Sequence, residues 1–369
     1  MTQAVPGPIA DVYKKSNQAL DSIYVAHTNF ESILDEVLDL IQEHEPQNEH
    51  QSILVTGFPG AGKTTLVEKI AAAFPRVKDG RRVAMRNGST AFCDCVPVVP
   101  IICPTSPREN SVVETLLEAL GDPFFDNRKP KAALDALQRY LSAGTARAIV
   151  VDEAQRPTDR KGKVLQRNVA TLFQKVHDWG YIVVLVGLGR TEGMLDEDGQ
   201  VDRRWSAPLR LAEYKWGDLD ALDGCGPESR YQFMGLLIAI AESVSLEWSP
   251  EIEFTNEKHA FLFYYASRGL AGNIKKLMFR VIRIMRKTQQ TLITWLILEQ
   301  AFGREFRTNL KEGKLQNPFT RWFVPALPPP LPDDRADIYI ATPSSRGKAS
   351  NANTKKARKA DLTERLTLK

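Results

Sequence analysis

The sequence is poor in cysteine and has no long apolar run. Among 369 residues there are only four cysteines, too few for a disulfide framework and typical of a reducing cytoplasm. The longest uninterrupted apolar run, residues 233–241, is about half of the ~18 residues that indicate a membrane span. The first thirty residues hold no long apolar stretch, which argues against a secretory signal. We therefore expect a cytoplasmic protein with no membrane contact.

The chain also lacks a strong charge of one sign over most of its length. Its net charge of +4 comes from 49 basic and 45 acidic residues. Residues 344–369 alone hold eight basic and two acidic residues, so the rest carries 41 basic against 43 acidic residues. A nucleic-acid surface in the folded part must therefore be a local patch. Hydrophobic residues make up 43% of the chain, enough for a large core and two or three domains.

Residues 1–50 are expected to form an N-terminal helical segment. An apolar stripe at steps of three and four residues consists of Ile33, Leu34, Val37, Leu38 and Ile41. Such a stripe either packs on its own domain, which we favour, or is the docking face for a partner.

Residues 51–215 alternate short apolar runs with helical stretches. Strands are predicted at residues 53–55, 96–102, 148–151 and 181–186, and helices at 64–74, 111–120, 131–143 and 164–179. The strand segments are almost wholly apolar, as in parallel sheets that are covered on both faces. This pattern predicts an α/β three-layer domain with a parallel sheet.

The strand pattern stops near residue 210. Residues 216–320 show helical spacing at 229–244, 257–266, 273–288 and 294–306, which predicts a smaller all-helical domain. Residues 321–369 begin with a proline-rich stretch, 325–332, expected to be a stiff extended spacer. The basic tail that follows has few large apolar groups and is expected to be disordered.

A glycine-rich turn between a predicted strand and a predicted helix is the strongest motif. Residues 57–64 match the phosphate-loop pattern G-x4-G-K-[ST]. Its glycines let backbone N–H groups turn toward phosphate oxygens, and the helix N-terminus adds a favourable field. Lys63 is expected to reach the β- and γ-phosphates of ATP, and the hydroxyl of Thr64 to bind Mg²⁺. The predicted nucleotide-binding residues of this turn are Gly57, Pro59, Gly60, Ala61, Gly62, Lys63, Thr64 and Thr65.

A second motif follows the predicted strand at residues 148–151. The strand ends in Asp152 and Glu153, with Gln155 two residues later. Asp152 is expected to hold Mg²⁺ through water, and Glu153 to polarise the attacking water as general base. We also assign Gln155 to the nucleotide site. Because a glutamate directly follows the aspartate, hydrolysis is favoured over phosphoryl transfer to a metabolite; a domain that binds nucleotide without turnover is the alternative.

Cys93, Cys95 and Cys103 do not show the spacing of zinc ligands. We expect buried thiols in a strand hairpin there.

Together these segments resemble AAA+ ATPases, and more narrowly the TniB/TnsC family of ATP-dependent regulators of transposon target selection. The resemblance rests on the phosphate loop, on the acidic strand end, on Arg203-Arg204-Trp205 before residues 208–211, and on residues 272–277. A strand at 97–104, the helix at 111–121 and Asn317-Pro318-Phe319 support the narrower family. It covers roughly residues 30 to 320.

The resemblance implies further site residues. Arg204, or its neighbour Arg203, matches the arginine that reaches the γ-phosphate of the adjacent subunit; an ordinary surface pair is the alternative. Lys275 matches the second sensor, where the family usually has arginine. The first-sensor position, by contrast, holds Gly187-Leu188-Gly189 instead of a polar residue, which predicts slow turnover.

The resemblance also implies a homo-oligomer, a ring or helical filament, around duplex DNA. We favour one basic cluster for backbone contact with DNA: Arg156, Arg160, Lys161, Lys163 and Arg167. A second cluster, Arg76, Lys78, Arg81, Arg82 and Arg86, is the alternative, and either is also consistent with a solvated loop. Binding is expected to be non-specific and salt-dependent.

The leading hypothesis is therefore an ATP-dependent DNA-binding regulator of transposition. It would recruit a transposase and a TniQ-like target-selection protein, with ATP hydrolysis driving disassembly. Two alternatives stay open: another AAA+ machine, such as an initiator or clamp-loader-like ATPase, and a nucleotide-gated scaffold with little ATPase activity.

Overall fold

The structure of the chain is a computed structural model. It describes residues 7–25, 27–45, 50–84, 90–159, 163–195, 204–217 and 227–332. Contacts divide the chain into two units, residues 1–335 and 336–369. The second unit, with most of the basic tail, lies outside the described residues, as do Arg86, Arg160, Lys161 and Arg203.

A five-stranded parallel sheet carries the first part of the chain. Its strands stand in the order β4-β5-β6-β1-β7. They are β1 (Ile53–Gly57), β4 (Val98–Ile102), β5 (Ala148–Asp152), β6 (Ile182–Gly187) and β7 (Leu209–Leu211). Every residue of β1, β5 and β6 is buried, which explains their nearly continuous apolar sequences.

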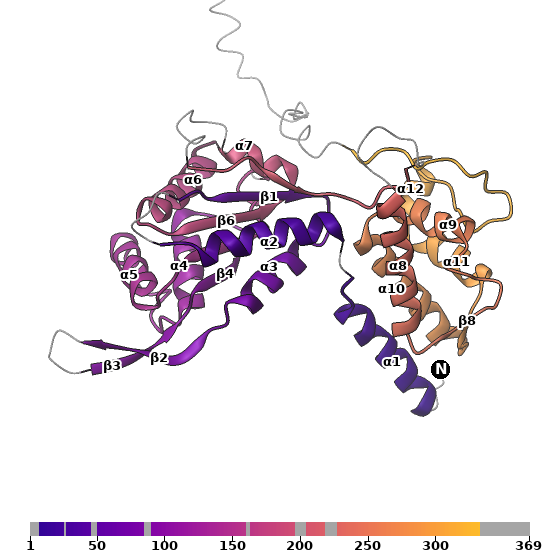
Figure 1. The fold of residues 1–369 in the computed structure, drawn as a ribbon, viewed down its shortest axis with the longest axis horizontal. Helices are drawn as coiled ribbons and strands as arrows, with labels where there is room; N and C mark the ends of the chain where they lie inside the picture. Colours follow the sequence, from indigo (N-terminus) through magenta and orange to yellow (C-terminus); the bar gives the residue numbers. More distant parts are fainter. Residues whose placement is uncertain are drawn as a thin grey trace, which may run out of the picture. The chain divides into compact units, whose positions relative to one another are not determined.

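Alternate residues of the strands contact helices on opposite faces of the sheet (Figure 1). Ile149 and Val151 of β5 pack with α4 (Glu109–Leu120), α5 (Pro130–Ala143) and α6 (Lys163–Asp178). Ala148 and Val150 pack in the core that holds α2 (Thr28–Gln42) and α3 (Lys63–Ala73). The three-layer α/β fold expected from the sequence is confirmed.

The N-terminal helices belong to two different cores. Ile33, Val37 and Ile41 of α2 are buried with the sheet, whereas Leu38 is only half-buried. Helix α1 (Gly7–Ser22) instead buries Tyr13 and Leu20 in the core of the C-terminal helices. The apolar stripe of α2 therefore packs on the α/β core.

The C-terminal part is mostly helical. It contains α8 (Pro227–Ser243), α9 (Glu257–Ser267), α10 (Ala271–Thr288), α11 (Trp295–Glu305) and α12 (Arg307–Lys311). A short parallel pair, β8 (Glu247–Trp248) with β9 (Leu292–Ile293), lies among them and was not expected. Among the described residues, no helix combines the length and apolarity that a bilayer crossing requires.

An antiparallel hairpin, β2 (Val77–Ala84) with β3 (Thr90–Cys95), precedes β4 (Figure 1). Cys95 lies in it as expected, but its free thiol is only half-buried, and the buried Cys103 follows β4 instead. Arg76 forms an ion pair with Asp94 at 2.6 Å beside the hairpin, and Lys78, Arg81 and Arg82 are exposed on β2. The alternative basic cluster is therefore largely a hairpin strand.

Candidate functional site

The phosphate loop connects β1 to α3, as its sequence predicts. Gly60 (φ +88°) and Gly62 (φ +98°) have left-handed backbone conformations that favour glycine. Lys63 is buried at the start of α3, and its Nζ donates hydrogen bonds to the carbonyl oxygens of Gly57 (2.8 Å) and Phe58 (2.9 Å). The lysine ammonium therefore lies inside the loop, where phosphate oxygens would be bound.

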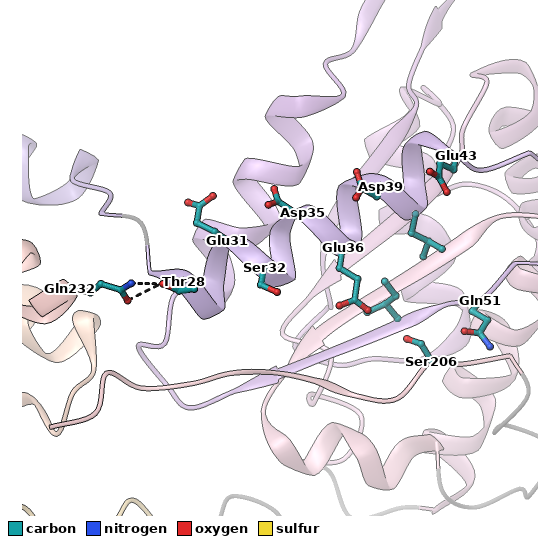
Figure 2. Close-up of a pocket in the computed structure, with 12 residues that line it drawn as sticks. Thr28, Glu31, Ser32, Asp35, Glu36, Asp39, Glu43, Gln51, Ser206 and Gln232 are labelled. Carbon is teal, nitrogen blue, oxygen red and sulfur yellow. Dashed lines mark hydrogen bonds between the residues drawn. The ribbon is translucent and has the colours of Figure 1, made fainter. Parts of the chain in front are cut away.

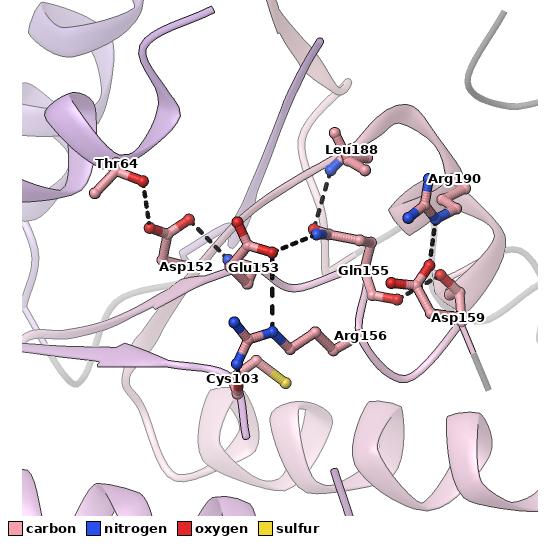
Figure 3. Close-up of polar contacts among 10 residues, drawn as sticks. Thr64, Cys103, Asp152, Glu153, Gln155, Arg156, Asp159, Leu188 and Arg190 are labelled. Atoms are coloured by element: carbon pink, nitrogen blue, oxygen red, sulfur yellow. Dashed lines mark hydrogen bonds and ion pairs between the residues drawn. The ribbon is translucent and has the colours of Figure 1, made fainter. Parts of the chain in front are cut away.

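Asp152 meets the phosphate loop across the sheet. It is buried at the end of β5, and its Oδ2 accepts a hydrogen bond from Thr64 Oγ1 at 2.9 Å (Figure 3). A hydroxyl and a carboxylate in contact are oxygen donors of the kind that Mg²⁺ prefers. These two residues fit the predicted metal site.

Glu153 has a left-handed backbone (φ +57°), which is uncommon for a residue with a side chain. Its carboxylate accepts a hydrogen bond from Gln155 Nε2 at 2.7 Å and lies 3.8 Å from Arg156 Nε (Figure 3). Gln155 Oε1 in turn accepts from the backbone N–H of Leu188 at 3.2 Å. Gln155 thus connects Glu153 to the end of β6.

Arg156 makes two contacts next to Glu153. Its guanidinium donates a hydrogen bond to the carbonyl oxygen of Cys103 at the end of β4, besides facing Glu153 (Figure 3). Among the other residues predicted to contact DNA, Arg167 is exposed on α6. Lys163 begins α6, but its side chain is outside the described residues.

A cavity of about 620 Å³ brings the predicted residues together with two segments from elsewhere in the chain. Its size is typical of small-ligand sites. One wall consists of Pro59, Gly60, Ala61, Gly62, Lys63, Thr64, Thr65, Glu153 and Gln155. A second wall is the loop at residues 269–272, together with Lys275, and a third includes residues 23–25, 27, 29 and 30. Gly57 and Asp152 adjoin this cavity through Lys63 and Thr64.

Lys275 lies in the cavity wall, one turn into α10. Its Nζ donates a hydrogen bond to the carbonyl oxygen of Ile23 at 2.9 Å. Burial lowers the pKa of Lys275 below its ordinary value, although the carboxylates of Asp21 and Glu68 oppose the shift. This lysine therefore connects α10 to the segment that joins α1 and α2.

The third wall was not found from the sequence. His27 contacts Tyr214 edge to face, with ring centroids 4.4 Å apart. The His27 Nε2 atom is buried without a hydrogen-bond partner among the described residues, and burial lowers the pKa of this imidazole. A short connection between two helices gives no sequence signal for such a site.

The end of β6 adds two residues that sequence reasoning did not assign. Arg190 lines the cavity and forms an ion pair with Asp159 (Figure 3). The buried hydroxyl of Thr191 has no hydrogen-bond partner among the described residues. It lies against Gly187, where an added Cβ would approach Thr191 Oγ1 to 2.3 Å. The sequence predicts that the end of β6 lacks a polar first-sensor residue. The turn after β6 places two polar side chains, Arg190 and Thr191, near that position.

Arg204 lies apart from the cavity. Its carbonyl oxygen accepts a hydrogen bond from Ser52 N, just before β1, whereas the phosphate loop follows the other end of that strand. The guanidinium pairs with Asp178 at 2.9 Å. Arg204 is thus placed away from the nucleotide site of its own chain.

A larger groove, about 900 Å³, runs beside α2 and away from the phosphate loop. Figure 2 shows Glu31, Asp35 and Asp39 projecting from this helix, with Glu43 just beyond its end. Glu36 lines the groove as well. Such a row of carboxylates repels phosphate groups.

Comparisons with known proteins agree with this geometry. The family model described as bacterial TniB protein matches residues 17–216. The chain belongs to the TniB family. A comparison with curated proteins finds no match to this TniB-family chain.

Solved structures show the same fold at low sequence identity. The chain is similar to Cdc6p from Pyrobaculum aerophilum, with a TM-score of 0.54, 15% identity, and 78% of this chain and 71% of that chain covered. It is also similar to the Aeropyrum pernix ORC1 protein in complex with DNA, with a TM-score of 0.52, 16% identity and coverage of 80% and 71%. This TniB-family chain therefore shares the fold of these proteins, with the phosphate-loop motif between β1 and α3.

Proposed function

We propose that this chain hydrolyses ATP and, in its ATP-bound state, assembles on duplex DNA as a regulator of transposition. The observation that carries the proposal is the contact of Thr64 with Asp152 at the mouth of the phosphate loop, with Glu153 next in sequence. The assembled protein recruits a transposase and a TniQ-like target-selection protein. Hydrolysis then releases the subunits.

The roles of the residues follow from their positions. Lys63 and the N–H groups of the phosphate loop bind the phosphates. Thr64 and Asp152 would hold Mg²⁺, which would supply positive charge against the phosphates. Glu153 takes the proton of the attacking water. Gln155 and Arg156 both contact Glu153 Oε2, so they orient the carboxylate while its other oxygen can accept the proton.

The position of Arg204 supports a requirement for neighbouring subunits. It lies beyond the N-terminal end of β1, so it does not reach the phosphates bound at the other end of that strand. A permanently charged, forked guanidinium suits contact with a γ-phosphate. We assign this contact to Arg204 of an adjacent subunit, with Arg203 next to it.

Contact with DNA is assigned to the cluster that includes Arg156, Arg160, Lys161, Lys163 and Arg167. It connects the acidic strand end to the exposed surface of α6. The similarity in fold to a protein solved in complex with DNA supports this proposal. The acidic groove beside α2 is unsuited to phosphate contact. Such backbone binding falls steeply with salt and does not depend on base sequence.

Electron microscopy of the protein with duplex DNA tests the proposal. With a non-hydrolysable ATP analogue and Mg²⁺ we expect rings or filaments on DNA, and with ADP bare DNA. The matched control is Lys63→Ala, which removes the phosphate-binding ammonium and is expected to leave DNA bare under both conditions. Free monomers beside bare DNA with the analogue would contradict the proposal.

A nucleotide-gated scaffold is the second candidate. It is favoured by Leu188 at the first-sensor position and by the contact of Glu153 with Arg156. Single-turnover hydrolysis in the presence of DNA separates the two functions: the scaffold retains its ATP, and the ATPase converts it to ADP.

A further inference from the structure

The proline-rich segment at residues 325–332, here named the strap, is attached to the helical part of the chain. Arg268 Nε donates to the carbonyl oxygen of Pro329 at 3.1 Å. Arg268 Nη2 donates to the carbonyl oxygens of Pro329 at 2.8 Å and Pro330 at 2.9 Å. The strap was expected to be a spacer, and it instead lies against the C-terminal end of α9.

The charge and the forked shape of the Arg268 guanidinium suit this attachment. A charged guanidinium donates stronger hydrogen bonds than a neutral group, and its forked shape fits two neighbouring acceptors. The prolines fix the strap backbone, so little conformational freedom is lost when it binds. Leu331 is half-buried and lines a small pocket of about 240 Å³ together with Ala266 and Leu315.

Arg268 is also the first residue of the loop that closes the nucleotide cavity. It ends α9 with a left-handed backbone (φ +56°). Residues 269–272, here named the lid loop, follow it directly and include the first two residues of α10. The position of the Arg268 side chain and the path of the lid loop are therefore set by the same backbone turn. A left-handed arginine is strained unless its surroundings hold it.

The lid loop is held tightly at both ends. At Gly269 the carbonyl oxygen accepts a hydrogen bond from Tyr214 N at 2.9 Å, and an added Cβ would come within 2.0 Å of the Tyr214 oxygen. At Gly272 the backbone N–H donates to Gly60 O at 3.0 Å, and an added Cβ would come within 2.6 Å of Gly60 Cα. The lid loop thus connects the turn at Arg268 to the phosphate loop through close backbone contacts.

We infer that Arg268 is a positioning residue for the nucleotide site, and that attachment of the strap to Arg268 raises the affinity of the cavity for ATP by holding the lid loop against Gly60. The inference rests on the proposed nucleotide site. Because coupling between two sites is reciprocal, bound nucleotide also strengthens attachment of the strap.

Two truncated chains separate the strap from the tail. A chain ending after Pro332 keeps the strap and lacks the tail, and a chain ending after Val324 lacks both. Calorimetry with a non-hydrolysable ATP analogue and Mg²⁺ gives the Kd of each. We expect the first chain to bind as the full chain does, and the second to bind about 10-fold more weakly, within the usual range of coupling between sites.

Point variants test the attachment itself. Arg268→Ala is expected to raise the Kd about as much as loss of the strap, and Arg268→Lys less, because lysine keeps the charge and loses the fork. The matched control is Arg321→Ala, since Arg321 is exposed and stacks on Trp322 outside the strap; it is expected to leave the Kd unchanged. Combining Arg268→Ala with loss of the strap should add no further loss.

Amide hydrogen exchange gives a readout that general destabilisation would not produce. Without the strap, residues 269–272 are expected to exchange faster while the sheet strands do not. In the full chain, nucleotide is expected to slow exchange at Ala326, Leu327 and Leu331. The inference is overturned if the full chain and the chain ending after Val324 bind the analogue with equal Kd. If the full chain itself binds no nucleotide, the proposed function fails first.

Discussion

At the scale of single residues, Glu153 is held in an unusual state. Its backbone is left-handed, and its carboxylate is engaged by Gln155 and by Arg156. Uncommon backbone conformations gather at functional sites, where the surroundings impose them. The acid at the end of β5 could be predicted from a strand followed by two carboxylates. The ion pair between Glu153 and Arg156 could not be predicted from the sequence, because it depends on the backbone turn after β5.

Glu153→Gln tests the role of this acid. The amide keeps the shape and the hydrogen bond to Gln155 but cannot take a proton from water. Steady-state turnover is expected to fall by about 10²- to 10⁴-fold, the usual contribution of a general base. The Kd for ATP, measured by calorimetry, is expected to stay within a few-fold of the original. Undiminished turnover would show that another group activates the water.

A second prediction concerns the imidazole rings of His44, His50 and His177. They lie beyond the end of β1 that is opposite the phosphate loop. His50 lies between His44 and His177, with ring centroids 4.9 and 4.4 Å away. Burial, then the neighbouring His50, lowers the pKa of His177 to about 4. Burial also lowers the pKa of His44, although its hydrogen bond to Gly180 O opposes the shift. The His177 ring is therefore neutral in the folded protein near pH 7, and the shift at His44 also favours its neutral form.

The sign of the pH dependence follows. Unfolded histidine titrates near pH 6.5, so the unfolded chain binds more protons than the folded one between pH 6.5 and about 4. The stability that the neutral His177 ring contributes is complete above pH 6.5 and is lost as the pH falls toward 4. For His177 we expect a loss of about 1–2 kcal/mol, allowing for partial exposure. Urea unfolding at pH 7 and 4.5 measures it, and His177→Asn should reduce the difference; an unchanged difference would contradict the assignment.

At the scale of elements, apolar runs predicted the buried strands because a parallel sheet covers both faces of each strand. They could not predict β2, whose Arg81 and Arg82 are exposed. The pair β8 and β9 was missed because two residues per strand are too few for a pattern. The helical stripe of α2 was found from its period, but only the structure shows that α1 and α2 pack in different cores.

Ile41→Ala tests whether α2 belongs to the α/β core. The Ile41 side chain is fully buried against the sheet-face core. Its truncation is expected to lower the free energy of unfolding by about 2–5 kcal/mol. Leu38→Ala is the matched control on the same helix, and because Leu38 is only half-buried, its loss should be clearly smaller. Equal small losses in urea unfolding would contradict the packing of α2 on the sheet.

At the scale of the whole molecule, the nucleotide cavity combines parts that are distant in sequence. The phosphate loop and the acids at 152 and 153 could be predicted, because each is a local motif at a strand end. The lid loop follows the phosphate loop by about two hundred residues, and Ile23 precedes it. No local sequence pattern predicts that these segments meet, because only the tertiary packing of α9, α10 and α1 brings them together.

Assembly predicts complementation between inactive variants. Arg204→Ala should abolish turnover while nucleotide binding remains, since Arg204 is placed away from its own cavity. Loss of its exposed pair with Asp178 should cost at most about 1 kcal/mol of stability. Mixing Arg204→Ala with Glu153→Gln should restore part of the ATPase activity, because some interfaces then contain both intact groups. A mixture as inactive as its components would contradict action between subunits.

The most direct measurement is calorimetric titration of the full chain with a non-hydrolysable ATP analogue, with Mg²⁺ and with a chelator in its place. The account predicts saturable binding of one nucleotide per chain, weakened when Mg²⁺ is removed. It also predicts that Thr64→Ala loses much of this Mg²⁺ dependence, because Thr64 contacts Asp152 at the proposed metal site. No heat of binding, or binding that Mg²⁺ and Thr64→Ala leave unchanged, would contradict it.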